Sequence, residues 1–339
     1  MIRTAVIGVG RMGRRHIEAA RSCGLDVVGI CDVNEQMLSL AAEQHGVGKE
    51  RHFRNPAEMF RRTEPDCVIV ATTAPTHCEY TIQAAESGVR YVLCEKPMAI
   101  SMRQCDLMIE ACRAQGTALA VNHQMRFMEQ YTAPKAIIDS EAFGGLRSVT
   151  VVAGNFGLSM NALHYFEMFR FMTGERPRIV TAWFSPETVP NPRGPQFEDR
   201  AGSVRIVTGS GKRFYLDCGA DQGHGMQAIY AGPFGQIFVD ELQGAMAVAM
   251  REEEYRVLPT TRYGMPAVRS VHSIAPADVI APSAAVLRAL LDGRDYPSGE
   301  EGRMAVAVLV AAYLSNERGN VAVDLEHDQL DFSREFPWA

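Results

Sequence analysis

Residues 5–16 read AVIGVGRMGRRH, and this stretch decides the fold. Its three glycines are Gly8, Gly10 and Gly13. Residues 4–7 predict a short buried strand, and a strand that leads through G-x-G-x-x-G into a helix is typical of a dinucleotide-binding unit. There the first glycine permits the tight turn, the second lets a pyrophosphate approach the backbone, and the third lets the helix pack on the sheet. The N–H groups near Arg11 and Met12 would then face the phosphates; the alternative is a structural turn in another α/β fold.

A carboxylate stands where such a unit binds the adenosine ribose. The stretch LDVVGICD, residues 25–32, predicts the second strand and ends on Asp32, 19 positions after Gly13. A carboxylate at this place binds ribose hydroxyls, and it repels the 2′-phosphate of NADP. Val33 and Asn34 follow, and neither is an arginine that would compensate. We therefore expect NAD as the cofactor; the alternative is a solvent-exposed aspartate at a strand end.

The first third of the chain alternates strand-like and helix-like segments. The apolar run PDCVIVATT, residues 65–73, is typical of a strand covered on both faces of a parallel sheet. This rhythm predicts a doubly wound Rossmann domain over residues 1–121. Farther along, runs such as SVRIV and RFYLD alternate apolar and polar residues, which indicates one covered face. We expect residues 122–339 to form a second α/β domain with an open, mainly antiparallel sheet.

Within the second domain, residues 161–172 predict a helix, and EYRVLP, residues 254–259, predicts a strand. Two more helices are expected over residues 283–291 and 300–316. The stretch 187–202 is rich in Pro, Gly and charge, and predicts a loop that either borders a cleft or connects strands on the surface.

Composition and charge narrow the class of protein. The 339 residues carry a formal net charge of −6, which favours neither a nucleic-acid partner nor an anionic membrane surface. No apolar run is long enough to span a bilayer, and the start lacks a secretory h-region, so we expect a cytoplasmic protein. The eight cysteines form no C-x-x-C pair, which favours buried reduced thiols. The nine histidines show no metal-ligand spacing, so we expect no metal.

A lysine follows the fifth predicted strand. Residues 94–101 read CEKPMAIS, with Glu95, Lys96 and Pro97 at the strand end. Ligands of open α/β sheets bind beyond the carboxyl ends of the strands, so Lys96 should point at the nicotinamide region. Its ammonium can orient a substrate hydroxyl and stabilise charge on oxygen as hydride leaves carbon. The alternative is a surface lysine in a turn.

Together these motifs resemble the Gfo/Idh/MocA oxidoreductase family, named for glucose–fructose oxidoreductase, inositol dehydrogenase and a rhizopine-catabolism protein. The matching stretches are IGVGRMGRRH with His16, ATTAPTHCEY with His77, YVLCEKPMA, VNHQMRF with Arg126, and ALHYFEMFRFMTGE with His164. These motifs cover the chain to about residue 175, and the rest matches only in its strand and glycine pattern. The resemblance implies a Rossmann domain, a C-terminal α/β domain whose open sheet mediates oligomerisation, and a substrate cleft between the two.

The resemblance also implies an activity and a set of site residues. Family members mostly oxidise or reduce one carbon of a sugar, cyclitol or sugar derivative, which implies a small sugar-like substrate, and we expect a homodimer or homotetramer. Lys96 and His164 correspond to the catalytic pair, and an imidazole can accept a hydroxyl proton near neutral pH. The residues expected to bind cofactor are Gly8, Gly10, Arg11, Met12, Gly13, Asp32, Thr72, Thr73, His77, Glu95 and Lys96. The residues expected to bind substrate are Lys96, Arg126, Asn161 and His164.

Two of these residues have structural alternatives. Arg126 can clamp a carboxylate or phosphate of the substrate, or it can pair with a local carboxylate such as Glu129. His164 can be a partly buried histidine of a helix.

The chain departs from the family pattern beside His164. Many polyol-oxidising members carry an aspartate four residues before this histidine, where this chain has Met160. Either Asn161 or the substrate fills the gap, or catalysis rests on Lys96 and His164 alone. The departure puts simple inositol or glucose oxidation in doubt and leaves room for sugar derivatives.

Three functions compete at this point. The leading one is an NAD-dependent sugar dehydrogenase or ketoreductase. A non-catalytic dinucleotide-binding regulator is the second, and the retention of Lys96 and His164 argues against it. A redox-assisted glycoside hydrolase, which would oxidise a sugar carbon transiently without net release of NADH, is the third. The sequence does not separate the first from the third.

Overall fold

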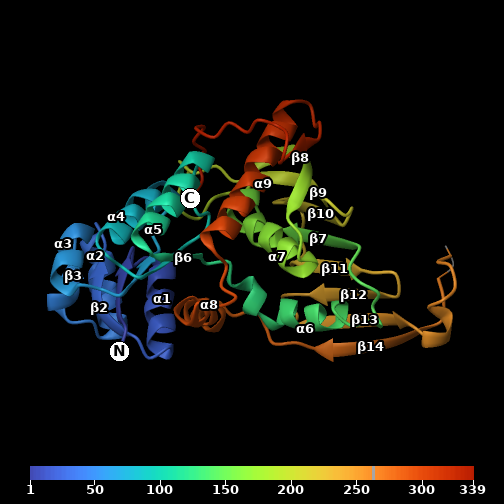
Figure 1. The fold of residues 1–339 in the computed structure, drawn as a ribbon, viewed down its shortest axis with the longest axis horizontal. Coiled ribbons are helices and arrows are strands. Elements are labelled where there is room, and N and C mark those ends of the chain that lie inside the picture. The colour runs from blue at the N-terminus through green and yellow to red at the C-terminus, as the bar shows by residue number, and fades with distance from the viewer. Residues whose placement is uncertain (262–263) are drawn as a thin grey trace. The chain divides into compact units, whose positions relative to one another are not determined.

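The computed structural model describes residues 1–261 and 264–339, and the packing divides the chain into two compact units, whose elements Figure 1 labels. The first unit contains Met1–Gln124, Asp278–Val306 and Asp331–Ala339, and the second contains Met125–Ala277 and Ala307–Leu330. The expectation of one continuous second domain over residues 122–339 is therefore corrected. Two later segments return to the first unit, because they carry apolar side chains that pack on its sheet and helices.

The first unit is built on a parallel sheet. Its described strands run in the order β3-β2-β1-β4-β5-β6, and each neighbouring pair is parallel. They are β1 (Arg3–Ile7), β2 (Asp26–Cys31), β3 (His52–Phe53), β4 (Cys67–Val70), β5 (Tyr91–Cys94) and β6 (Ala118–Val121). The strand order reverses direction between β1 and β4, the place where such sheets bind their ligands. The predicted doubly wound sheet is confirmed.

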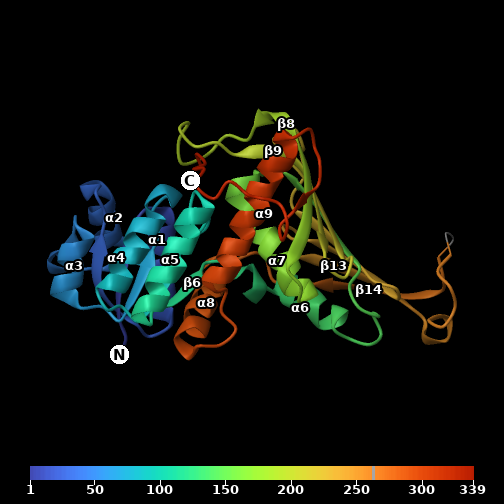
Figure 2. The ribbon, with the colours of Figure 1, turned by 45° about the horizontal axis from the view of Figure 1, so that its top comes forward.

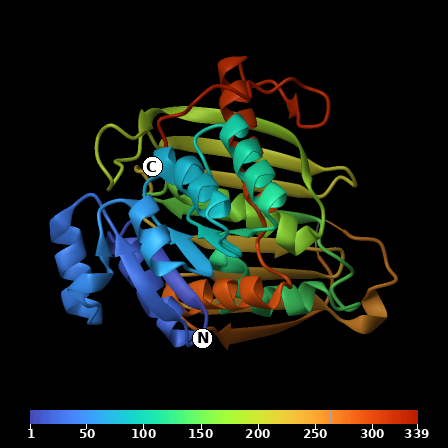
Figure 3. The same ribbon diagram turned by 60° about the vertical axis from the view of Figure 1, so that its left-hand side comes forward.

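Helices cover both faces of this sheet. They are α1 (Arg11–Ser22), α2 (Glu35–His45), α3 (Pro56–Thr63), α4 (His77–Glu86), α5 (Met102–Gln115) and α8 (Ile280–Asp292), with short 3-10 turns at Lys49–Arg51 and Ala74–Thr76. Contacts group α1 with α2 and α8, and α4 with α3 and α5, which are the two layers of a doubly wound fold. Both ends of the chain belong to this unit (N and C in Figure 3).

The β6 edge of the sheet is closed by the segment before α9 (Gly299–Glu317). Val121 N donates a hydrogen bond to the carbonyl of Pro297 at 2.8 Å. Glycine lets the helix come close, because a Cβ on Gly302 would lie 2.4 Å from Cγ2 of Val121. The final residues dock on the same unit, with Phe336 N donating to the Ile100 carbonyl at 2.9 Å. The boundary between the two units falls inside α9.

The second unit is built on a mixed sheet. Its described strands run in the order β14-β13-β12-β11-β7-β10-β9-β8-β15, and all neighbouring pairs are antiparallel except β7 with β10. They are β7 (Ser148–Gly154), β8 (Pro177–Thr188), β9 (Arg200–Thr208), β10 (Arg213–Gly219), β11 (Gln227–Ala231), β12 (Gly235–Asp240), β13 (Ala245–Arg251), β14 (Ala267–Ser273) and β15 (Val323–Asp324). The predicted mainly antiparallel sheet is confirmed. The strand predicted at residues 254–259 is wrong, because the chain there forms a 3-10 turn at Glu253–Tyr255.

Helices α6 (Glu129–Ile138) and α7 (Leu163–Thr173) lie on one face of this second sheet (Figure 2). Alternate strand residues are buried beneath them, as the alternation in the sequence predicted. Phe214 of β10 packs edge-on to Phe166 of α7 at 6.2 Å between ring centroids. On the opposite face, Trp183 and Tyr215 are 52% and 36% exposed. The sheet therefore keeps one face covered and one face open to solvent.

All eight cysteines lie in the described part of the chain and are free thiols, seven of them buried. Burial raises the pKa of the Cys67 thiol to about 12, which keeps it protonated and unreactive. The prediction of buried reduced thiols is confirmed. Within the described residues, we find no helix with the length and apolar character needed to cross a membrane.

A buried carboxyl group joins the helices of the second unit to its sheet. Glu241, just after β12, accepts hydrogen bonds from the hydroxyls of Tyr131 on α6 and Tyr165 on α7, at 2.7 and 2.8 Å. Burial raises the pKa of Glu241 from its ordinary value of 4.5 to about 7; the charge of Asp240 adds to the rise, and the two tyrosine hydrogen bonds oppose it. The carboxyl group thus takes up a proton on folding at mildly acidic pH.

Replacing Glu241 should therefore change how stability depends on pH. Between pH 4.5 and 7 the folded state binds more protons than the unfolded state, so the free energy of unfolding falls as pH rises. The shift corresponds to roughly 3 kcal/mol. The difference in unfolding free energy between Glu241→Gln and wild type should rise by about that amount from pH 4 to pH 8. Urea unfolding followed by Trp183 fluorescence in a Trp338→Phe background measures it, and a difference independent of pH would contradict the assignment.

Candidate active site

The strand ends of the first unit bring the predicted cofactor residues into one row. Ile7 pairs with Cys31 and Val70, and Val70 pairs with Cys94. The residues that follow these partners are Gly8, Asp32, Ala71 and Glu95. Glycine, ribose-binding carboxylate and E-K-P motif are therefore aligned at the carboxyl edge of the sheet, where ligands of this fold bind.

The glycine loop has the shape that a pyrophosphate requires. Gly8 has a φ of +81°, and a Cβ on Gly13 would lie 1.8 Å from the carbonyl oxygen of Gly8, so the helix packs directly on the turn. A Cβ on Gly10 would meet no atom within 4 Å, which leaves the backbone open to a bulky ligand. Asn34, Asn55 and Ser101 cap α2, α3 and α5 with their side chains, but α1 has no side-chain cap and no acidic residue in its first turn.

This helix end can therefore hold an anion. The N–H groups at the start of a helix carry partial positive charge, and at α1 no side chain of the chain itself satisfies them as a cap. Arg11 and Met12 supply the first two of these N–H groups, as the sequence predicted. The residues present fit a dinucleotide phosphate.

Asp32 holds the glycine loop and faces the same edge. Its Oδ2 accepts from Val9 N at 2.8 Å, and its Oδ1 accepts from Asn34 N at 2.9 Å. Each carboxylate oxygen can accept more than one hydrogen bond, so these two contacts orient Asp32 and still allow it to bind ribose hydroxyls. The aspartate thus ties the phosphate loop to the second strand.

An arginine beside Asp32 was missed by the sequence analysis. Arg54 follows the short strand β3, and its Nη2 donates to the Val33 carbonyl at 3.1 Å. Sequence reasoning examined only the residues directly after Asp32, whereas Arg54 reaches this place from the neighbouring strand of the sheet. The signal that could have found it is the position of Arg54 at the end of a two-residue strand.

Glu95 is the centre of a buried polar network. His16 Nε2 lies 2.7 Å from Glu95 Oε1, and Asn122 Nδ2 donates to the same oxygen at 2.9 Å. Lys96 N donates to Oε2 at 3.1 Å, and Asn122 also donates to Ser283 Oγ of α8 at 3.2 Å. Burial alone would raise the pKa of Glu95, but the hydrogen bond and charge of His16, with Lys96 and Asn122, hold it well below its usual range. The carboxylate is ionised and joins α1, β5 and the chain after β6.

The loop that carries Lys96 is held from a second side. The Lys96–Pro97 peptide is cis, and Lys96 is buried. His77 is fully buried, with Nδ1 2.8 Å from the Pro97 carbonyl and Nε2 3.2 Å from the Thr72 carbonyl. His77 therefore bridges the loop after β4, which includes Thr73, to the loop after β5.

The other predicted site residues belong to the second unit. Asn161 lies in a π-helical turn, Leu158–Ala162, that leads directly into α7. His164 is the second residue of α7 and is buried. The predicted helix over residues 161–172 is thus confirmed in position, with an irregular first turn that the sequence did not predict. Single π-helical turns are frequently found at functional sites.

Arg126 pairs with Glu167, a partner that the sequence analysis did not predict for it. Its guanidinium Nη2 contacts Oε1 of Glu167, which also accepts from Arg170 Nη2 at 3.1 Å. Glu167 lies on α7 three residues after His164 and is fully buried. The suggested partner Glu129 accepts a hydrogen bond from Ala275 N at 2.6 Å. The pairing fixes Arg126 beside the helix that carries His164.

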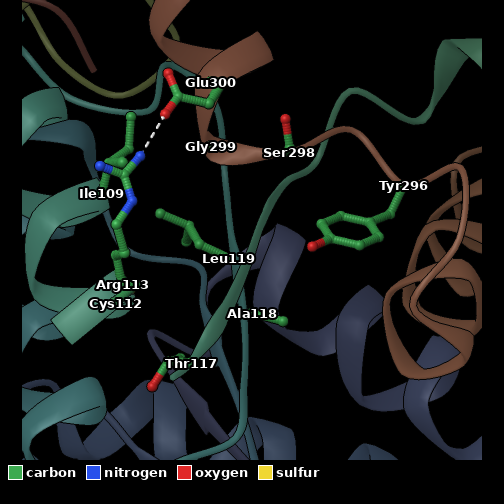
Figure 4. A pocket seen from close by; sticks show the side chains of 10 residues that line it. All are labelled: Ile109, Cys112, Arg113, Thr117, Ala118, Leu119, Tyr296, Ser298, Gly299 and Glu300. Carbon is green, nitrogen blue, oxygen red and sulfur yellow. Dashed lines mark hydrogen bonds and ion pairs between the residues drawn. The ribbon is translucent and has the colours of Figure 1, made fainter. Parts of the chain in front are cut away.

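A small cavity lies elsewhere in the first unit (Figure 4). It measures about 250 Å³ and lies between α5, the start of β6 and the segment before α9. Arg113 and Glu300 pair across it at 3.1 Å. Thr117, Ala118 and Leu119 belong to the amino-terminal side of β6, so this cavity lies at the opposite end of the strand from the row of cofactor residues.

Residues 2–123 match the family described as "Oxidoreductase family, NAD-binding Rossmann fold", the Gfo/Idh/MocA family. Residues 2–123 therefore form an NAD-binding domain of the Gfo/Idh/MocA type. The match confirms the resemblance stated from the motifs and the NAD-binding character of the first unit.

Relatives in sequence agree with this match. A D-apiose dehydrogenase of Paraburkholderia graminis is 30% identical over 195 residues, which cover 52% of this chain and 51% of the relative. An inositol 2-dehydrogenase of Klebsiella pneumoniae is 26% identical over 270 residues, covering 74% and 77%. The chain thus spans about half the length of the first of these relatives and about three quarters of the second.

The fold of both units is also found among solved structures. An oxidoreductase from Agrobacterium radiobacter, solved in complex with NAD+, L-tartaric acid and magnesium, has a TM-score of 0.80 at 22% identity, covering 96% of this chain and 98% of the other. An aldose-aldose oxidoreductase from Caulobacter crescentus has a TM-score of 0.76 at 22% identity, covering 95% and 99%. These likenesses confirm the predicted fold class.

The cofactor preference of the protein should depend on Asp32. NAD(H) should bind much more tightly than NADP(H), because the Asp32 carboxylate repels a 2′-phosphate. Asp32→Ser with Val33→Arg should narrow or reverse that preference. Adding Arg54→Ala should weaken NADP binding by the double variant, since Arg54 contacts the backbone of residue 33 directly after Asp32. Calorimetry measures the affinities of these three proteins for both cofactors, and equal binding of NAD and NADP by the wild type would contradict the role of Asp32.

Proposed function

We propose that the protein is an NAD(H)-dependent oxidoreductase that transfers a hydride between the nicotinamide and a CH–OH or keto carbon of a sugar, cyclitol or sugar derivative. The observation that carries the proposal is the buried network around Glu95, which fixes Lys96 in the row of cofactor residues. The names of the relatives, D-apiose dehydrogenase and inositol 2-dehydrogenase, support the substrate class.

Lys96 is proposed to orient and polarise the reacting oxygen. Its backbone is held by Glu95 and its loop by His77, so its side chain starts from a fixed position. An ammonium so placed stabilises negative charge on oxygen, and it needs no rearrangement at the moment of reaction. Bound NAD supplies the hydride acceptor at this edge of the sheet.

His164 is proposed to exchange the proton of the substrate hydroxyl. An imidazole takes up and releases protons near neutral pH, which suits an oxidation that must remove a hydroxyl proton. Its helix is anchored at Tyr165 by Glu241 and at Glu167 by Arg126. The histidine therefore stands on a helix with little freedom to shift.

Arg126 and Asn161 are proposed to contact substrate. A guanidinium has five N–H donors, so a bond to Glu167 is compatible with contact to a substrate carboxylate or hydroxyl. Asn161 offers both a donor and an acceptor to a hydroxyl group. Residue 160 is Met, so it offers no side-chain carboxylate. We therefore expect Arg126 and Asn161 to bind a sugar derivative as substrate rather than a simple polyol.

The open sheet of the second unit is proposed to form a homodimer or homotetramer in the cytoplasm. Trp183 and Tyr215 expose apolar surface on this face, and burial of such surface drives association. The covered face is already filled by α6 and α7, so the open face is the one left for a second copy.

Replacing either member of the catalytic pair should lower turnover strongly and spare cofactor binding. Lys96→Ala should lower kcat roughly a hundredfold or more, the usual effect of a positioned acid–base group. His164→Ala should do the same and flatten the limb of the pH–rate profile near neutrality. NAD affinity should stay nearly intact, because Asp32 and the glycine loop are unchanged. A screen of sugars and cyclitols for NADH formation measures turnover, and wild-type rates in the double variant would refute the mechanism.

Disruption of the open face should reduce the oligomer. Light scattering at micromolar concentration should give at least a dimer for the wild type. Trp183→Glu with Tyr215→Glu should lower the mass, because charge on this face opposes burial. Leu107→Glu, an equally simple change at an exposed apolar residue of α5, is the control and should leave the mass unchanged. A monomeric wild type would contradict the proposal.

A further inference from the structure

The turn before His164 is held by a buried carboxylate from a distant part of the chain. Asp199 lies just before β9 and is buried. Its Oδ1 accepts hydrogen bonds from Ser159 N and Ser159 Oγ, both at 2.8 Å, and from Met160 N at 3.3 Å. These donors belong to the π-helical turn Leu158–Ala162. Asp199 thus joins the loop between β8 and β9 to the start of the helix that carries His164.

A glycine leaves the space that this carboxylate occupies. A Cβ on Gly157 would lie 2.0 Å from the Asp199 carboxyl group, so any other residue would push the two segments apart. The Gly157 carbonyl accepts from Asn161 N at 3.1 Å and from Ala162 N at 3.2 Å, which winds the turn. Asp199 and Gly157 therefore act together on the same few backbone atoms.

The physical need for Asp199 follows from the position of the turn. The first N–H groups of a helical segment have no partner within the segment, and a carboxylate satisfies them and offsets the positive helix end. π-helical turns are rare and occur mostly as single turns. Asn161 lies within the turn, and His164 follows it by one residue of α7.

We propose that Asp199 is a positioning residue that fixes the turn 158–162 and through it sets the places of Asn161 and His164. The inference rests on the proposed function. It also bears on the absence of a side-chain carboxylate at position 160. A carboxylate does contact this turn, but it belongs to Asp199 and accepts a hydrogen bond from the backbone N–H of Met160. The helix thus receives a carboxylate that holds its backbone.

The test compares two substitutions of Asp199 that distinguish its role as hydrogen-bond acceptor from its negative charge. Asp199→Ala removes the acceptor, and Asp199→Asn keeps an oxygen at Oδ1 for Ser159 and Met160. Glu198→Ala is the matched control, because Glu198 is next to Asp199 in the chain but its side chain pairs with Arg200. For each folded variant we would measure kcat, KM and the Kd of NAD by calorimetry.

Asp199→Ala should lower kcat roughly ten- to a hundredfold, the effect of a misplaced reacting group, with KM changed less and the Kd of NAD unchanged. Asp199→Asn should restore most of kcat, and Glu198→Ala should match the wild type. A purely structural role would lower the melting temperature and leave kcat per folded molecule intact. A kcat within twofold of wild type in Asp199→Ala, or no rescue by asparagine, would overturn the inference.

A second readout does not depend on turnover. The Cε1–H resonance of His164 in the NMR spectrum should move in Asp199→Ala and stay near its wild-type position in Asp199→Asn. If the wild type oxidises no sugar or cyclitol, the proposed function fails, and this resonance still tests the inference. An unchanged resonance in Asp199→Ala would overturn it.

Discussion

The hydrogen bond between Glu95 and His16 is the interaction on which the candidate site depends. The two side chains are buried, and their atoms lie 2.7 Å apart. Removing His16 would leave the buried Glu95 carboxylate without this hydrogen bond, and an unsatisfied buried polar group costs about 1–3 kcal/mol. His16 comes from α1 and Glu95 from the end of β5, so the pair ties the phosphate-binding helix to the loop of Lys96. One contact thus sets two parts of the cofactor edge.

Buried carboxyl groups also join segments of the second unit. Glu241 accepts hydrogen bonds from tyrosine hydroxyls of α6 and α7, and Asp199 accepts hydrogen bonds from N–H groups of the turn before α7. Glu167 forms ion pairs with Arg126 and Arg170. In each case a buried carboxylate fixes one segment of the helix that carries His164. Since burying such groups is costly unless they are paired, their number around one helix is better explained by positioning than by stability.

The sequence predicted most of the first unit and less of the second. The strand ends aligned because parallel sheets bring their carboxyl ends together, so Gly8, Asp32 and Glu95 could be placed from spacing alone. The packing of residues 278–306 on the first unit could not be predicted, because the sequence of an amphipathic helix does not indicate which sheet the helix covers. Arg54 and Asp199 were missed for a related reason: each acts on residues that are distant along the chain.

The account claims that hydride passes between a carbinol carbon of a sugar-like substrate and NAD bound at this edge. The most direct test is a single turnover with NAD+ and sugars, cyclitols and sugar acids that carry deuterium on their carbinol carbons. Mass spectrometry of the quenched cofactor should show reduced nicotinamide that is one mass unit heavier with at least one of these substrates. Consumption of a substrate without label in the cofactor would contradict the account, as would the absence of any transfer from all of them.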